Sequence, residues 1–152
     1  MKINNGFTLI ELLVVIFIIG TLTGIIMPNF IGSRQRARDS RRKHDLIEIK
    51  SALRLYYNDN QAYPSNVFFG NQFGADGEYM NKVPQDPLSG SRSYDYCVAD
   101  SGDGFVLCAD LENDGDGDNL TLAGSDCDGI CPADDLCDCG DADDQCYFVC
   151  AN

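Results

Sequence analysis

A run of 20 uncharged residues, numbers 12–31, most constrains how this chain can fold. Fourteen of them are Leu, Val, Ile, Met or Phe. At about 1.5 Å per residue, a helix of this length spans roughly 30 Å, the thickness of a bilayer's hydrocarbon core. A secretory signal would be followed by an A-x-A cleavage site, and residues 20–35 contain none. We therefore expect a helix that stays on the mature chain, as a membrane anchor or as the core of an assembly.

Charge changes sign along the rest of the chain. Residues 34–54 carry eight basic and three acidic side chains, whereas residues 93–152 carry sixteen acidic side chains and neither Lys nor Arg. The net charge of −13 argues against free nucleic-acid binding. The single histidine, His44, stands among charged residues and is predicted to be a solvated surface residue. Because no nucleophile–base set is visible, we do not expect an enzyme.

The flanks of the apolar run and the cysteines give different orientations in a membrane. Lys2 and the initiator amine precede the run, and six basic residues follow it, at positions 34, 36, 38 and 41–43. Taken alone, this distribution would place the C-terminal part in the cytoplasm. Eight cysteines instead favour a disulfide-bonded domain in an oxidising compartment. We give the cysteines more weight and expect a C-terminal domain outside the cytoplasm.

The start of the chain carries a specific motif. Residues 2–11 read Lys-Ile-Asn-Asn-Gly-Phe-Thr-Leu-Ile-Glu, so that a short polar stretch ends at Gly6 and Phe7 opens the apolar segment. This resembles the leader of the type IV pilin-like family, which includes type IV pilins and the pseudopilins of type II secretion. The resemblance implies that a prepilin peptidase cuts between Gly6 and Phe7, that Phe7 is N-methylated, and that the apolar helix is retained.

Glu11 places a carboxylate at the edge of the apolar zone, which is unfavourable in hydrocarbon unless the charge is paired. The resemblance implies that the new amine of Phe7 meets Glu11 of a neighbouring subunit. Such a pair would neutralise both charges and set the axial register of a filament. The alternative is that Glu11 simply lies at the level of the lipid headgroups.

Two glycines and a proline interrupt the apolar run. Gly20 and Gly24 form a small-xxx-small pair, which allows helices to approach closely. Pro28 lacks an amide hydrogen and is expected to kink or locally open the helix. In filaments of the resembling family the stretch that corresponds to residues 20–28 often loses helicity. A plain membrane helix that tolerates these residues is the other interpretation.

The helical pattern continues beyond the apolar run. Leu46, Ile49, Leu53 and Tyr56 form one apolar stripe, which predicts an amphipathic helix that ends near residues 58–60. The basic residues at 34–43 have two interpretations. They form a solvated helix face beside lipid headgroups, or they match the acidic domain of the next subunit electrostatically.

A small sheet is expected after this helix. Residues 83–87 read Val-Pro-Gln-Asp-Pro and resemble the P-x-D-P element of the major pseudopilin of type II secretion. That family usually has Trp-Gly next, where this chain has Leu88-Ser89, so the choice between pilin and pseudopilin stays open. Alternation over residues 94–98 and 105–108 predicts an antiparallel hairpin. A symmetric register places Cys97 opposite Cys108 and would allow a disulfide between them, although either could pair with the tail.

The acidic tail has too few apolar residues to order itself. Disulfides are the first candidate to hold it, and zinc is less favoured because there is no C-x-x-C pair. Calcium is the second candidate, since carboxylates alternate with glycine without completing an EF-hand, and the resembling pseudopilins carry calcium in a similar place. A solvated acidic loop is the alternative. The candidate calcium ligands are Asp110, Asp114, Asp116 and Asp118, and the six tail cysteines, with 15 possible pairings, are Cys127, Cys131, Cys137, Cys139, Cys146 and Cys150.

Together these features predict an α+β fold. A long N-terminal helix, transmembrane in its first half and amphipathic in its second, packs on a small antiparallel sheet with a disulfide-rich acidic C-terminal tail. The expected segments are a leader (1–6), a transmembrane or filament-core helix (7–33), an amphipathic helix (34–59), a sheet domain (60–110) and the tail (111–152).

The expected function is that of a structural subunit of a type IV filament, either a pseudopilin in protein secretion or a pilin. The expected partners are further copies of the chain, prepilin peptidase, an inner-membrane assembly platform with its ATPase, and lipid before assembly. The expected location is the inner membrane, crossed once, and then a periplasmic or cell-surface filament. The alternative function is a membrane-anchored extracellular module for calcium-dependent binding or adhesion.

Overall fold

The computed structural model of the chain describes residues 7–113, 115–118, 127, 129–131 and 146–151, without the side chains of residues 28–31. The chain falls into two compact units, Met1–Gln35 and Arg36–Asn152. Three residues that the sequence singles out, Gly6, Cys137 and Cys139, lie outside the described residues, as does Asp114.

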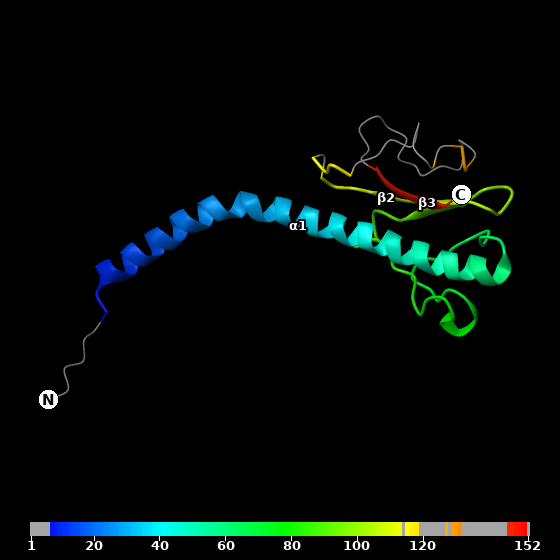
Figure 1. Cartoon of the computed structure of the whole chain (residues 1–152). Coiled ribbons are helices and arrows are strands. Elements are labelled where there is room, and N and C mark those ends of the chain that lie inside the picture. The colour runs from blue at the N-terminus through cyan, green and yellow to red at the C-terminus, as the bar shows by residue number, and fades with distance from the viewer. Residues whose placement is uncertain (1–6, 114, 119–126, 128, 132–145, 152) are drawn as a thin grey trace. The chain divides into compact units, whose positions relative to one another are not determined.

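A single helix, α1, runs from Leu9 to Asn60 over 52 residues (Figure 1). Within it, Leu9–Met27 is long and apolar enough to cross a membrane, and none of that segment is buried inside the subunit. The helix ends where the sequence predicts. Gln61 adopts a left-handed φ of 56° and its N–H donates to the Tyr57 carbonyl at 2.8 Å, which closes the last turn.

The sheet has three antiparallel strands in the order β1–β2–β3, with β1 at Asp95–Val98, β2 at Phe105–Asp110 and β3 at Cys146–Ala151. The predicted hairpin between β1 and β2 is confirmed, but its predicted register is wrong, because Cys97 lies opposite Val106 rather than Cys108. Relative to the expected register, the centre of the turn lies one residue closer to the N-terminus. The Ala99 N–H donates to the Gly104 carbonyl at 2.9 Å.

Two glycines favour this position of the turn. Gly102 takes a φ of 73°, a conformation that L residues with side chains adopt rarely. Gly104 approaches the end of β3 so closely that a Cβ there would lie 2.9 Å from the Ala151 carbonyl oxygen. Because the shift from the expected register is two residues, each side chain keeps its predicted face and only its neighbour across the hairpin changes.

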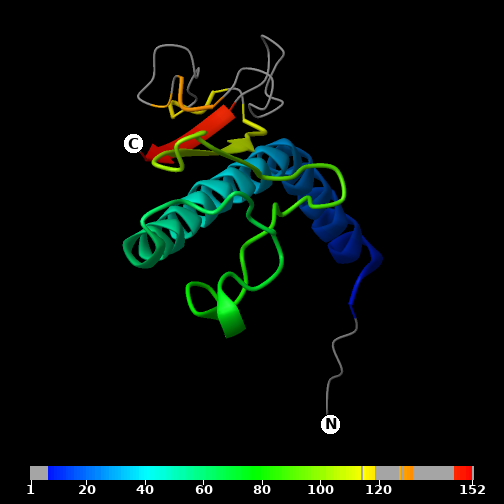
Figure 2. The same cartoon turned by 90° about the vertical axis from the view of Figure 1, so that its right-hand side faces the viewer.

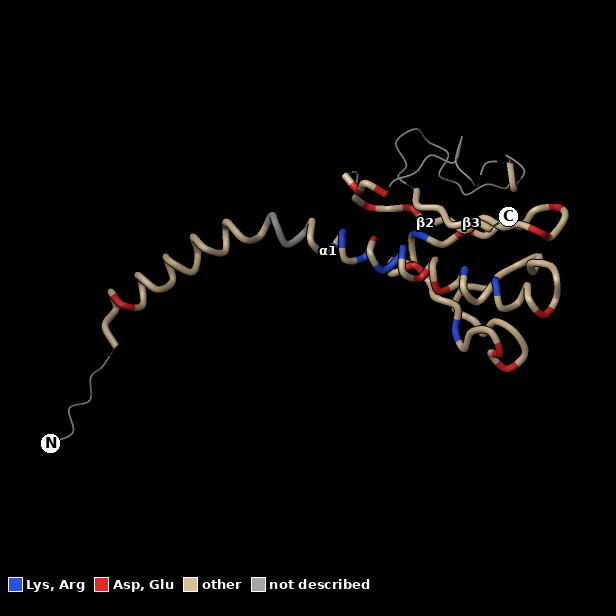
Figure 3. Tube along the Cα trace, viewed as in Figure 1, with Lys and Arg blue, Asp and Glu red and all other residues tan. Residues whose placement is uncertain are grey.

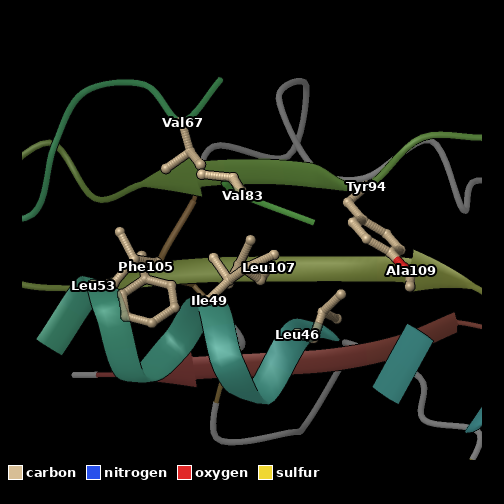
Figure 4. Packing of buried hydrophobic residues seen from close by; sticks show 9 residues of the cluster. All are labelled: Leu46, Ile49, Leu53, Val67, Val83, Tyr94, Phe105, Leu107 and Ala109. Atoms are coloured by element: carbon tan, nitrogen blue, oxygen red, sulfur yellow. The ribbon is translucent and has the colours of Figure 1, made fainter. Parts of the chain in front are cut away.

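The main apolar core lies between the sheet and the second part of α1. Figures 1 and 2 show the sheet along one side of this part of the helix and the segment after α1 along another. Burying side chains of this kind contributes about 1.5–3 kcal/mol each, so this face holds the domain together. The buried members, all in Figure 4, are Leu46, Ile49, Leu53, Val67, Val83, Tyr94, Phe105, Leu107 and Ala109.

The opposite face of the sheet is covered by cysteines. Val106 and Phe148 pack there against buried Cys97, Cys108, Cys127, Cys131 and Cys146. Disulfides join Cys97 to Cys131 and Cys127 to Cys150, with Cα–Cα distances of 6.2 and 5.6 Å. Cys108 and Cys146 are disulfide-bonded as well.

Of the two alternatives for Cys97, the bridge to Cys108 is wrong and the pairing with the tail is confirmed. In the actual register the residue opposite Cys97 is Val106, and Cys97 bonds to the tail instead. The two described bridges span 34 and 23 residues of sequence. Closing loops of this size stabilises a fold by about 3 kcal/mol each in the chain-entropy account. These bridges link Cys131 to β1 and Cys127 to β3.

Candidate functional site

The first turn of α1 positions the carboxylate of Glu11. Its Oε2 accepts hydrogen bonds from the Thr8 N–H at 2.9 Å and from the Thr8 hydroxyl at 2.6 Å, and the Glu11 N–H donates to the Thr8 hydroxyl at 3.4 Å. This reciprocal arrangement is a capping box, and the T-x-x-E spacing in the sequence could have predicted it. The carboxylate is thereby fixed near the backbone of Phe7, whose side chain is 78% exposed.

The two predicted close-approach glycines are open to a neighbour. A Cβ added to Gly20 or Gly24 would meet no atom within 4 Å in the single chain. The hydroxyls of Thr21 and Thr23 donate back to the carbonyls of Ile18 and Ile19 at 2.8 and 2.7 Å, so neither hydroxyl is left unpaired on this apolar surface. The backbone of α1 stays helical through residues 20–28. Opening of this stretch in a filament therefore stays a prediction.

The second part of α1 carries a buried ion-pair network centred on Arg42. The Arg42 side chain is fully buried, and its Nε and Nη2 donate to the two carboxylate oxygens of Asp86 at 2.6 and 3.2 Å. Its Nη1 donates to Asp39 at 2.6 Å and to Glu112 at 2.7 Å. Asp86 also accepts the N–H of Leu88 at 2.6 Å. The aspartate of the P-x-D-P element thus ties its loop to the helix.

The same network ties the chain after β2 to the helix. Asp39 accepts the backbone N–H groups of Glu112 and Asn113, both at 3.0 Å, and Arg38 binds the Glu112 carboxylate with two nitrogens. Hydrogen bonds from Arg38, reinforced by Arg42, lower the pKa of Glu112 to about 2. Burial acts to lower the pKa of Arg42, but the carboxylates around it outweigh burial and raise it. Glu112 and Arg42 therefore both stay charged at neutral pH.

Pairing within the subunit corrects the expectation for three of the basic residues at 34–43. Carboxylates of the same subunit pair with Arg38, Arg42 and Lys43, so these side chains are bound neither to lipid headgroups nor to the next subunit. Figure 3 shows basic residues along the second part of α1 and acidic residues in the same region. Arg41 differs, since its side chain is 67% exposed and its Nε lies 3.9 Å from Asp45. Apart from Asp39, three residues before Arg42, the carboxylate partners of these three cations lie 44 to 75 residues away, where sequence periodicity does not detect them.

A second buried polar pair lies beside the network. The Tyr94 hydroxyl donates to Asp45 Oδ2 at 2.8 Å, and both residues are buried. Burial raises the pKa of Asp45, although the hydrogen bond from Tyr94 opposes this shift. Burial and the neighbouring Asp45 also raise the pKa of Tyr94, which keeps its proton at physiological pH. The pair adds another polar link between α1 and the sheet domain.

The three described members of the predicted calcium set do not share one partner. Asp110 pairs with Arg92, whereas Asp116 and Asp118 both bind the Lys43 ammonium, at 2.6 and 2.9 Å. Burial acts to lower the pKa of Lys43, but its hydrogen bonds to the two aspartates raise it. Among the described residues no group of three or more His, Cys, Asp or Glu side chains is arranged to hold a metal ion. Calcium binding stays a prediction at this point.

The single histidine lies on the surface, as predicted. The His44 side chain is 71% exposed, and its Nδ1 lies 3.7 Å from Glu48 Oε1 on the next turn of α1. It stands apart from the buried network, so nothing in its surroundings favours catalysis or metal binding.

The sequence is similar to those of known proteins, both in its N-terminal segment and beyond it. Residues 1–27 match the family model described as the prokaryotic N-terminal methylation motif. The chain is 30% identical to the type II secretion system core protein G of Vibrio cholerae over 132 residues, which cover 77% of this chain and 88% of that protein. The proteins of the same name from Pectobacterium carotovorum and Escherichia coli are 35% and 40% identical over 97 and 62 residues, covering 55% and 41% of this chain and 62% and 43% of those proteins.

No solved structure matches this chain. The methylation motif explains the polar leader before the apolar helix. The match to the Vibrio cholerae protein extends well beyond that helix, because it covers more than three quarters of the chain. The chain therefore belongs to the family of the type II secretion system core protein G, the major pseudopilin, and is a structural pseudopilin subunit.

Proposed function

We propose that this chain is made as a membrane-anchored precursor, is cut between Gly6 and Phe7, and polymerises into a helical pseudopilus. The observation that carries the proposal is the state of the segment Leu9–Met27, which is apolar and wholly unburied within the subunit. Its large apolar side chains are 45% to 80% exposed. Because burying each such side chain is worth about 1.5–3 kcal/mol, the segment requires lipid or neighbouring helices around it.

Glu11 favours the filament over the membrane as the final state. In lipid its carboxylate is a charged group at the edge of the hydrocarbon, with a penalty that reaches about 3 kcal/mol at the bilayer centre. Cleavage after Gly6 would create a free amine at Phe7, and the capping box already holds the carboxylate on the first turn. Pairing with that amine on an adjacent copy removes the penalty from both groups and fixes how far one subunit is displaced along the next.

The partners follow from this route. The precursor requires a prepilin peptidase that cuts after Gly6, and an assembly platform with an ATPase that extracts the apolar helix from the membrane. Before assembly the helix lies once across the inner membrane, with the disulfide-bonded domain outside the cytoplasm, where its bridges can form. The role is mechanical rather than catalytic. No observation supports the alternative of an adhesion module.

The proposal is tested by filament yield in cells that express the chain together with its secretion genes. Glu11→Ala is expected to be processed normally but to give few or no sheared filaments, while Glu11→Asp keeps the charge and restores part of the yield. Glu48→Ala is the matched control, because Glu48 is an exposed glutamate on α1 outside the apolar segment.

Two results would overturn the proposal. One is a mature protein that begins at Met1 by mass spectrometry, which would exclude processing after Gly6. The other is a filament yield for Glu11→Ala equal to that of the wild type. Accumulation of processed, membrane-bound Glu11→Ala protein without filaments would support the role of the carboxylate in assembly rather than in processing.

A further inference from the structure

The acidic loop that follows β2, of which residues 111–113 and 115–118 are described, binds a cationic side chain of α1. The Nζ of Lys43 lies 2.6 Å from Asp116 Oδ1 and 2.9 Å from Asp118 Oδ2. Asp116 Oδ1 also accepts the backbone N–H of Asp118 at 3.0 Å, so one oxygen organises both the ion pair and the local turn. The described carboxylates at the tip of this loop thus converge on an ammonium group.

The ammonium is held in place by its surroundings. The Lys43 side chain is only 17% exposed, and its Nζ lies 5.5 Å from the centre of the Tyr147 ring, a cation–π distance. Tyr147 is in β3, where it pairs with Ala109 of β2, and Lys43 is in α1. The lysine is therefore positioned by a helix and a sheet, and the loop folds onto a charge that is already in place.

Two other described acidic groups of the region are bound to different cations. Asp110 pairs with Arg92, and Glu112 pairs with Arg38 and Arg42. Calcium prefers six to eight oxygen ligands at about 2.3–2.6 Å from one centre. The described carboxylates are instead divided among separate cationic side chains, and a divalent ion next to Asp116 would be repelled by the ammonium of Lys43. The described part of the predicted calcium set does not fit a calcium ion in this arrangement.

We propose that the Lys43 ammonium is the structural cation of this loop and replaces the calcium ion that the family resemblance implies. The subunit then folds its acidic loop onto the sheet without calcium from its surroundings. This inference concerns the folded subunit and does not depend on polymerisation, so filament assembly can fail without contradicting it.

The test compares thermal unfolding of the full mature chain in detergent micelles with a calcium chelator and with millimolar calcium, which is enough to fill weak extracellular sites. All seven tyrosines lie in residues 56–147, so near-ultraviolet circular dichroism of tyrosine reports on the C-terminal unit. The wild type is expected to melt at the same temperature in both conditions. Lys43→Met keeps the aliphatic stem, removes the charge, and is expected to melt on the order of 5 °C lower in chelator.

Lys82→Met is the matched control, because Lys82 is an exposed lysine of the same unit and should melt like the wild type. Partial recovery of Lys43→Met by calcium would support the proposal further, since calcium would then reach the aspartates that lysine had occupied. A wild-type melting temperature that rises by several degrees with calcium would overturn the proposal. A Lys43→Met protein as stable in chelator as Lys82→Met would overturn it too. If Lys43→Met does not fold, the calcium titration of the wild type decides alone.

Discussion

Replacing Arg42 by Met tests whether the buried ion-pair network holds the helix to the sheet domain. The substitution keeps most of the aliphatic volume and removes a guanidinium that makes hydrogen bonds of 2.6 to 3.2 Å to three carboxylates. Asp39 and Asp86 are 1% and 4% exposed, and both would lose their buried counter-charge. Glu112 would retain Arg38.

The magnitude follows from leaving charges buried without a partner. Removing one member of a buried ion pair destabilises a protein by about 3–5 kcal/mol. For a unit of this size each kcal/mol lowers the melting temperature by about 3–4 °C, so Arg42→Met is expected to melt about 9–20 °C lower. Arg42→Lys keeps the charge but loses the paired hydrogen bonds to Asp86. Its melting temperature should therefore lie between those of the wild type and Arg42→Met.

The assay is tyrosine circular dichroism of the full chain in detergent, combined with a double-mutant cycle between Arg42→Met and Asp86→Asn. Neutralising Asp86 removes one of the two orphaned charges, so the double variant should lose less stability than the sum of the single variants. Arg41→Met is the control, because the Arg41 side chain is 67% exposed and should contribute less than about 1 kcal/mol. If Arg42→Met and Arg41→Met melt together, the network does not stabilise the fold and the reasoning is refuted.

Three further predictions concern other parts of the same unit. Arg38 and Arg42 lower the pKa of Glu112 from 4.5 to about 2, so the stability that Glu112 contributes is complete above pH 4.5 and is lost as the pH falls toward 2. The melting temperatures of the wild type and Glu112→Gln should therefore converge as the pH is lowered. An equal difference at pH 7 and pH 3 would contradict this. Removing one bridge as Cys97→Ala with Cys131→Ala should destabilise the chain by about 3 kcal/mol in chemical unfolding, and an unchanged midpoint would argue against this disulfide. Gly104→Ala places a Cβ 2.9 Å from the Ala151 carbonyl oxygen and should destabilise the fold by about 1–3 kcal/mol. Gly90→Ala, whose Cβ would have nothing within 4 Å, should leave the stability unchanged. Equal stability of the two variants would mean that β3 does not pack against Gly104.

Local patterns predicted α1 and the hairpin of β1 and β2, but not β3, which lies in the segment expected to be a tail. The stripe of Leu46, Ile49 and Leu53 predicted the buried face of α1, and the alternation around Phe105 predicted a β2 with two distinct faces. These features depend on periods of 3.6 and 2 residues, which a sequence displays directly. The hairpin register was beyond such patterns, because it depends on which glycine closes the turn and on the close approach of β3 to Gly104.

The partners of the charged residues were also beyond sequence patterns. The basic stretch was visible, but apart from Asp39 on α1 itself, the carboxylates that pair with Arg38, Arg42 and Lys43 lie 44 to 75 residues away. Nothing in local spacing says whether a basic helix face meets water, a second subunit or its own chain. The same holds for Cys97, whose partner Cys131 is chosen by the face of the sheet on which both lie.

The amino-acid sequence by itself determined the methylation motif, the apolar helix and the carboxylate at its first turn, because these are properties of contiguous residues and of their transfer from water to an apolar environment. The tertiary structure alone decided which oppositely charged groups meet, which cysteines bond and which cation the acidic loop surrounds. Those choices are made by distances between segments far apart in the chain, and such distances exist only once α1 and the sheet have packed together.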